Sequence, residues 1–152
     1  MFTFTGHPDW TMEILDDNTF GMLEYHGADT IVTIPSDVCG KKVTKICDEA
    51  FSTWKEDISW EDEFRLMAIK KVIIPDTVKT IGFEAFAECT NLSEVVLPET
   101  ITSIGMLAFR NCHRLNKINI PEGCQIEDGA FLNCDCIEHA RIGIKERECF
   151  SL

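Results

Sequence analysis

The sequence predicts an α/β repeat solenoid, with short stacked strands on one face and turns or short helices opposite. The first observation is a period of 23 residues, because residues 69–115 contain the same pattern twice. Units of this length bury their apolar faces only by stacking on one another. The second observation is an alternating strand pattern that ends at a proline in each unit. The repeated pairs are Pro75 and Pro98, Gly82 and Gly105, Phe86 and Phe109, and Cys89 and Cys112.

The N-terminal segment predicts a β-hairpin over residues 10–25. Its halves, WTMEIL and FGMLEY, are rich in strand formers, and Asp16-Asp17-Asn18-Thr19 between them suits a turn. A solenoid needs an atypical terminal unit over its open core, so we expect residues 1–28 to form an N-terminal β-hairpin cap. We expect a single domain over 1–152, with repeats over 29–143 and a tail over 144–152.

The first repeat unit, residues 26–51, is longer than the next. Pro35 aligns with Pro75 and Phe51 with Phe86, but Phe51 lies five residues further from its proline. The extra residues surround Gly40, which is followed by two lysines. This pattern indicates a turn tip at Gly40.

Residues 52–68 interrupt the period with twelve additional residues, which predict a helical insertion. Apolar residues at helical spacing favour two short amphipathic helices, and Ser59 with Asp62 favours a cap at the start of the second. The residues at this spacing are Ala50, Trp54 and Ile58, then Trp60, Phe64 and Met67. The spacing favours packing of Trp54, Trp60 and Phe64 onto the solenoid; the alternative is that they are anchors for a partner.

The third unit, residues 115–137, has lost one residue. Pro121 keeps the 23-residue step, but Phe131 and Cys134 follow their counterparts by 22 residues. Residues 137–144 predict a last strand. Cys89, Cys112 and Cys134 recur at one position of the repeat, which favours small apolar groups that fill the core.

The repeated segments are similar to a known family. IPDTVKTIGFEAFAECTNL and LPETITSIGMLAFRNCHRL resemble the BspA-type leucine-rich repeat, and YHGADTIVTIPSDVCGKKVTKICDEAF resembles the opening unit of that family. The resemblance covers about residues 25–137. It implies a leucine-rich-repeat solenoid with a binding or adhesion role rather than catalysis, often on bacterial cell surfaces. Cys47 and Glu127 stand where the family pattern has glycine.

Composition argues against several classes of partner. The net charge is −12, and without a basic run the chain is not expected to bind nucleic acid. No apolar run reaches about 18 residues, so we expect no membrane span. The first residues lack the pattern of a signal peptide, which favours the cytoplasm; if the chain is a fragment, a cell-surface location is expected instead.

The sequence indicates a protein that is not an enzyme. Its four histidines lie in unrelated units, and it has no phosphate loop, HExxH motif or nucleophile elbow. Cys134 and Cys136 are the only close cysteine pair, so a metal site is not expected. We therefore expect no cofactor, and we expect reduced buried thiols.

The outward positions of the stacked strands are the main candidate for a binding face. Ile73 and Val96 would give it an apolar centre with polar ends; the alternative is a solvated sheet. The expected function is non-catalytic binding of an unknown protein partner. The alternatives are a cell-surface adhesion module separated from its signal or from a longer array, and a structural protein that self-associates through its solenoid ends. The outward residues are Ile31, Thr33, Lys71, Ile73, Glu94, Val96, Lys117, Asn119, His139 and Arg141.

Overall fold

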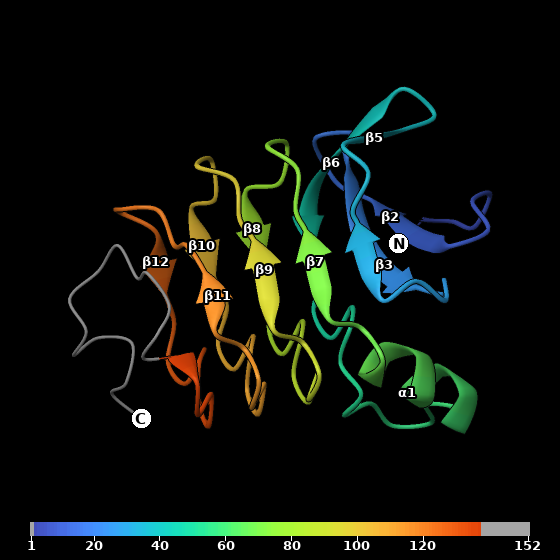
Figure 1. Cartoon of the computed structure of the whole chain (residues 1–152). Helices are drawn as coiled ribbons and strands as arrows, with labels where there is room; N and C mark the ends of the chain where they lie inside the picture. Colours follow the sequence, from blue (N-terminus) through green and yellow to red (C-terminus); the bar gives the residue numbers. More distant parts are fainter. Residues whose placement is uncertain (1, 138–152) are drawn as a thin grey trace.

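The computed structural model describes residues 2–137, which form a β-solenoid with two sheets on opposite sides (Figure 1), and the strands of successive repeats are parallel within each sheet. One sheet has the order β1-β2-β3-β6-β8-β10-β12, with β5 paired to β6, and the other has the order β11-β9-β7-β4. The elements are β1 (Thr3–Phe4), β2 (Trp10–Ile14), β3 (Phe20–Tyr25), β4 (Ile31–Thr33), β5 (Asp37–Val38), β6 (Lys41–Ile46), α1 (Trp60–Met67), β7 (Lys71–Ile73), β8 (Thr80–Ile81), β9 (Glu94–Val96), β10 (Ser103–Ile104), β11 (Lys117–Ile118) and β12 (Gln125–Ile126).

Strands of successive units pair in parallel and in register, as the period predicts. Lys71 on β7 pairs with Glu94 on β9, which pairs with Lys117 on β11, so each step is one repeat. On the opposite side, Ile104 on β10 pairs with Ile126 on β12. The third unit is one residue shorter, yet this pairing keeps its register. The lost residue therefore falls in the turn before β12.

A column of phenylalanine rings fills the core along the solenoid. Phe51, Phe86, Phe109 and Phe131 are all buried, and their ring centroids lie 4.8, 5.1 and 5.3 Å apart in succession. Their planes are nearly parallel, with angles of 9° or less. One buried aromatic ring per unit therefore links each turn of the solenoid to the next.

The recurring cysteines lie inside, as predicted, and they also link neighbouring turns. Each thiol donates a hydrogen bond to a phenylalanine carbonyl of the preceding turn, at 2.9–3.2 Å. The pairs are Cys89 with Phe51, Cys112 with Phe86, and Cys134 with Phe109. The carbonyls of Phe86 and Phe109 also accept from the backbone N–H groups of Cys89 and Cys112 in their own turns, so each thiol adds a hydrogen bond between neighbouring turns.

The repeated glycine is required by close packing of the backbone. A Cβ atom at Gly105 would lie 2.7 Å from the carbonyl carbon of Gly82, in the preceding turn. Cys47 stands at the corresponding place in the first unit. Its Sγ fits because it faces Gly21 of β3, where an added Cβ would lie 2.6 Å from that sulfur. The departure at Cys47 is therefore accommodated by the N-terminal strands.

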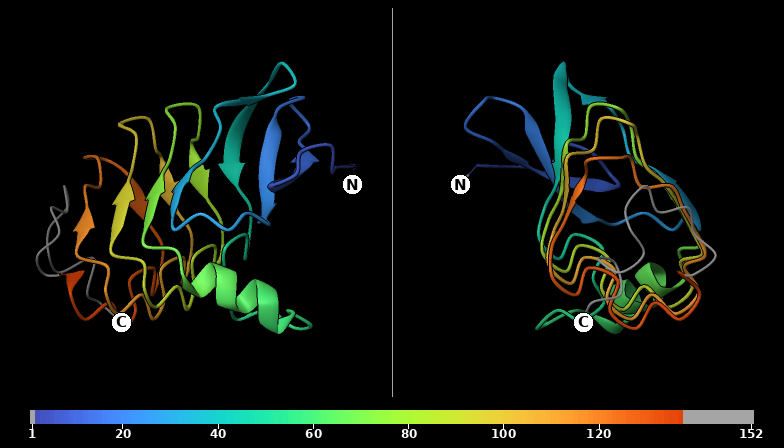
Figure 2. Two further views of the ribbon diagram at one scale, coloured as in Figure 1. Left: turned by 45° about the vertical axis from the view of Figure 1, so that its right-hand side comes forward. Right: turned by 90° about the vertical axis from the view of Figure 1, so that its left-hand side faces the viewer.

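The predicted hairpin is present and covers the first turn. β2 and β3 pair antiparallel, and β3 pairs in parallel with β6, so the cap continues the larger sheet (Figure 2). The rings of Trp10 and Tyr25 lie 6.5 and 5.8 Å from Phe51, the first ring of the column. β1, which the sequence did not indicate, pairs antiparallel with β2. Aromatic side chains thus cover the N-terminal end of the core.

The extra residues of the first unit form a second, smaller hairpin. β5 and β6 pair antiparallel, and Cys39 and Gly40 between them have φ values of 51° and 80°. The predicted turn tip at Gly40 is confirmed, because its left-handed conformation costs least for glycine.

The insertion contains one helix rather than the predicted two. Residues 51–59 are turns and loops, and Asp57 has a φ of 61°, which is incompatible with a continuous helix from Ala50 to Ile58. α1 begins after Ser59, whose hydroxyl accepts a hydrogen bond from the backbone N–H of Asp62. The predicted cap of this helix is therefore confirmed.

The C-terminal features lie beyond the described part of the chain. The predicted strand at 137–144 and the tail at 144–152 fall outside the described residues, apart from Ile137, which is buried. Within residues 2–137, no helix is both long and apolar enough to span a membrane.

Candidate functional site

The outward positions of β4, β7, β9 and β11 lie on one face in the predicted register. Ile73 pairs with both Thr33 and Val96, while Ile31 pairs with Lys71. Ile31 and Val96 are 58% and 39% exposed, and Ile73 is half-buried. This face therefore carries a small apolar patch of three aliphatic side chains.

Polar side chains surround this patch. The Lys71 ammonium lies 3.3 Å from the Glu94 carboxylate on the neighbouring strand. Lys117 and Asn119 are exposed at the β11 edge of the sheet. His139 and Arg141, also predicted for this face, lie outside the described residues. Aliphatic residues exposed in so small a group are common on soluble proteins, so this face carries only a weak signal for binding.

The insertion presents the larger apolar side chains, and here the favoured prediction is wrong. Trp60 and Phe64 are 75% and 73% exposed, whereas Leu66 is the buried residue of α1. Trp60 and Phe64 are neighbours at i and i+4 on one side of the helix. The helix therefore turns Leu66 toward the core and its aromatic side toward solvent.

Contacts at several points hold α1 in this orientation. Arg65 donates from Nη1 to the carbonyl of His26 at 2.9 Å, and Asn91 donates to the carbonyl of Met67 at 2.7 Å. Ile58, just before the helix, packs against the core. The exposed aromatic pair is thus carried on a helix that is fixed to the solenoid. A fixed helix loses little backbone freedom when a partner binds.

Trp54 is also exposed, at 65%, and it lies on the edge of a polar network. The guanidinium carbon of Arg110 lies 5.5 Å from the centroid of its ring, within the range of a cation–π interaction. Arg110 also pairs with Glu84 at 3.6 Å and with Glu88 at 3.8 Å. Trp54 thus contacts the solenoid through one face of its ring, against the largely buried Arg110, while most of its side chain stays exposed.

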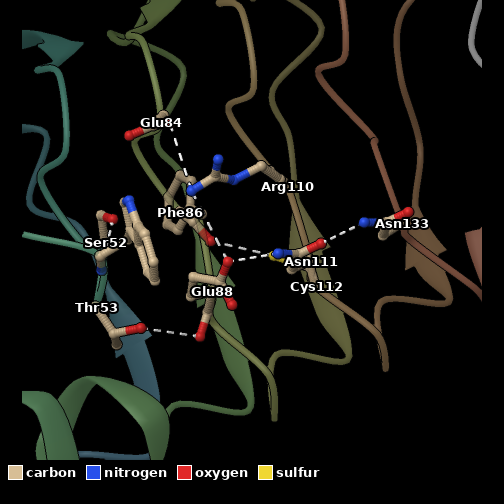
Figure 3. A network of polar contacts seen from close by, with 10 residues as sticks. Ser52, Thr53, Glu84, Phe86, Glu88, Arg110, Asn111, Cys112 and Asn133 are labelled. Atoms are coloured by element: carbon tan, nitrogen blue, oxygen red, sulfur yellow. Dashed lines mark hydrogen bonds and ion pairs between the residues drawn. The ribbon is translucent and has the colours of Figure 1, made fainter. Parts of the chain in front are cut away.

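A ladder of polar side chains, shown in Figure 3, runs beside this network along successive turns. Thr53 donates to the carbonyl of Glu88, the Asn111 amide donates to the Glu88 carboxylate, and Asn133 donates to Asn111 at 2.8 Å. Glu88, Asn111 and Asn133 all have φ values near 60°. The sequence signal for this ladder was the asparagine before the cysteine in two units, because asparagine tolerates that conformation well.

A surface pocket of about 410 Å³ opens beside Trp54. The residues that line it are Glu49, Trp54, Lys55, Glu56 and Glu84. Glu84 is nearly buried, and its carboxylate is compensated by Arg110. The Lys55 ammonium lies 4.0 Å from Glu24. The pocket thus combines an exposed indole with three carboxylates and one lysine, and the ammonium of that lysine also faces Glu24 outside the pocket.

The described residues offer little for metal or redox chemistry. Among residues 2–137, no group of three or more histidine, cysteine or acidic side chains could hold a metal ion. The seven cysteines of this range are unbridged. Burial raises the pKa of the Cys89 and Cys134 thiols to about 12, and raises that of Cys112 as well. Protonated thiols of this kind are poor nucleophiles.

A protein-family model and several solved structures are similar to this chain. The family model described as BspA type Leucine rich repeat region matches residues 60–150, in 6 copies. No curated protein matches the chain. The chain is similar to a crystal structure of a leucine-rich repeat protein from Bacteroides capillosus, with 29% identity and a TM-score of 0.73. That similarity covers 92% of this chain and 97% of the other.

Two further solved structures are similar. A leucine rich cell surface protein from Faecalibacterium prausnitzii is 29% identical with a TM-score of 0.72, and the match covers 88% of this chain but 35% of that one. This chain therefore spans about a third of the length of that structure. A leucine-rich repeat protein from T. pallidum is 21% identical with a TM-score of 0.65, over 86% of this chain and 67% of that one, a likeness of fold.

Proposed function

Because the chain belongs to the BspA-type leucine-rich-repeat family, we propose that it is a non-catalytic module that binds another protein through the exposed aromatic side of α1. The observation that carries this proposal is the exposure of Trp60 and Phe64, about three-quarters each, on one side of a fixed helix. Tryptophan and other aromatic anchors supply much of the energy of protein interfaces.

The outward sheet face supports this choice by contrast. The outward sheet face offers three aliphatic residues, one of which is half-buried, and its Lys71–Glu94 pair already satisfies both charges. Within residues 2–137, the rings of Trp60 and Phe64 make no aromatic or cation–π contact. Leaving them in water brings no benefit to folding, because burying Leu66 already attaches the helix to the core.

Replacing Trp60 and Phe64 together by serine is expected to remove the partner. The bait is the wild-type chain, used for affinity capture from its native cell with quantitative mass spectrometry. A protein retained by the wild type should be reduced at least about 30-fold on W60S/F64S, because anchor residues contribute about 2 kcal/mol or more. Thermal unfolding checks that the variant still folds.

The matched control is I73K/V96K, which places two charges on the outward sheet face. This variant should retain the same protein as the wild type. If W60S/F64S retains the partner and I73K/V96K loses it, the binding surface is the sheet and the proposal for α1 is wrong. If all three baits retain the same proteins equally, neither surface binds.

A second candidate is an adhesion module at a cell surface. It is favoured by the similarity to the leucine rich cell surface protein of F. prausnitzii, of which this chain spans about a third. Labelling of intact cells with an antibody to the chain separates the candidates, since adhesion requires the chain to be accessible from outside.

A further inference from the structure

The sequence around the exposed aromatics is strongly acidic. Residues 54–64 contain Glu56, Asp57, Glu61, Asp62 and Glu63 but only one basic residue, Lys55. All five carboxylates are at least partly exposed. Asp62 pairs with Arg65 at 3.5 Å, and the Lys55 ammonium faces Glu24. The exposed rings therefore lie in a region of negative potential, on a chain whose net charge is −12.

The chain already shows how this region holds a cation. The guanidinium of Arg110 stacks 5.5 Å from the Trp54 ring centroid while Glu84 and Glu88 face its charge. Even with this contact, Trp54 is 65% exposed. The pocket of about 410 Å³ beside the ring is lined by two further carboxylates, Glu49 and Glu56. It therefore offers a second cation the same combination of an aromatic ring and acidic groups.

Charge selects between the partners that could cover these rings. An acidic segment would be repelled. A purely apolar one would remove water from several carboxylates without replacing it by a donor, which is costly. A basic segment satisfies both requirements, because its ammonium or guanidinium groups pair with the carboxylates while its aliphatic stems and neighbours cover the rings.

We propose that the partner docks a lysine- or arginine-rich peptide segment here, with one basic side chain in the pocket beside Trp54 and aliphatic side chains over Trp60 and Phe64. This proposal rests on the proposed function of α1 and adds the chemistry of the partner. Trp54 and Trp60 are six residues apart, so their Cα atoms lie within about 20 Å of each other. A segment of six or seven extended residues is long enough to reach both.

Selection from a library of random 12-residue peptides displayed on phage tests the proposal. Peptides enriched on the wild-type chain should be rich in lysine or arginine together with aliphatic residues. The best of them, synthesised with a fluorescent label, is then titrated by fluorescence anisotropy. Its affinity should fall roughly fivefold on E49Q/E56Q, because each exposed charge pair contributes about 0.5 kcal/mol. On W54A it should fall roughly tenfold.

The matched control is E99Q/E122Q, which removes the same two charges from exposed positions outside the pocket. Its affinity should stay within about twofold of the wild type, since screening weakens charges that are distant. If E99Q/E122Q and E49Q/E56Q weaken binding equally, only the overall charge of the chain matters. The proposal that a basic side chain binds in the pocket beside Trp54 is then wrong.

The outcomes separate this inference from the proposed function. Enriched peptides that are neutral or acidic, yet lose binding on W60S/F64S, overturn the basic partner and leave the proposed surface in place. Peptides that bind W54A, E49Q/E56Q and W60S/F64S as tightly as the wild type overturn the inference, because they bind another surface. Failure to enrich any peptide overturns the inference, while the capture experiment decides the function separately.

Discussion

Replacing Phe109 by alanine is expected to lower the free energy of unfolding by about 3–5 kcal/mol. Phe109 is fully buried, and its ring lies 5.1 Å from that of Phe86 and 5.3 Å from that of Phe131. Truncation therefore opens a cavity between two turns of the solenoid and removes two stacked contacts. Urea denaturation, followed by circular dichroism, measures the change.

Phe64→Ala is the matched control, because it removes the same atoms from a ring that is 73% exposed. Its free energy of unfolding should stay within about 0.5 kcal/mol of the wild type. If both alanine variants shift the denaturation midpoint by the same amount, the phenylalanine column does not hold successive turns together in solution. A difference of several kcal/mol between identical substitutions assigns the effect to position in the column.

The period explains why most of the fold could be predicted. Residues that recur every 23 positions must occupy equivalent places in successive turns, so Phe86 and Phe109 are in the same environment by symmetry. The same argument placed Cys89 and Cys112 inside. Where one residue was lost, before β12, the pairing of Ile104 with Ile126 still continued, because a turn absorbs a deletion more easily than a strand.

The insertion could not be predicted in the same way. Helical spacing shows that Trp60 and Phe64 share a side of α1, but not whether that side faces the core. The orientation depends on contacts from distant parts of the chain, namely Arg65 to His26 and Asn91 to Met67. With these contacts made, Leu66 is the residue turned inward.

The Arg110 network was missed for a different reason. Comparison of the repeats relates residues that lie 23 positions apart. Arg110 instead pairs with Glu84 and Glu88, which lie 26 and 22 positions earlier and therefore at other positions of the repeat. Its position over Trp54 depends on the insertion, which has no counterpart in the other units. Sequence reasoning on the repeat therefore finds the scaffold, while the candidate binding residues come from the part that does not repeat.

The second large effect concerns pH. Burial raises the pKa of the Cys47, Cys89 and Cys134 thiols to about 12 from an ordinary value near 9, and raises that of Cys112 in the same direction. The thiols stay protonated in the folded chain at pH values where they ionise in the unfolded chain. Their contribution to stability is therefore complete below about pH 9 and is lost as the pH rises from 9 toward 12.

The expected loss is on the order of 1 kcal/mol per thiol for each pH unit above 9, so the four thiols together should lower the free energy of unfolding by several kcal/mol per unit. Since small domains are stable by about 5–15 kcal/mol, the chain should unfold within a few pH units above 9. Urea denaturation at pH 8, 10 and 11, with reductant present, measures the slope.

Serine at Cys89 and Cys112 isolates the thiols from other groups that titrate in this range. A serine hydroxyl is similar in size and can donate to the carbonyls of Phe51 and Phe86, but it does not ionise at these pH values. The slope of stability against pH between 10 and 11 should therefore be roughly half as steep in the double variant C89S/C112S as in the wild type, because two of the four buried thiols are gone. Cys39→Ser, at the exposed hairpin turn, is the matched control, because it makes the same substitution at a thiol outside the core. Equal slopes for C89S/C112S and the wild type would contradict the argument, because they would mean that these two thiols titrate alike in the folded and unfolded chains.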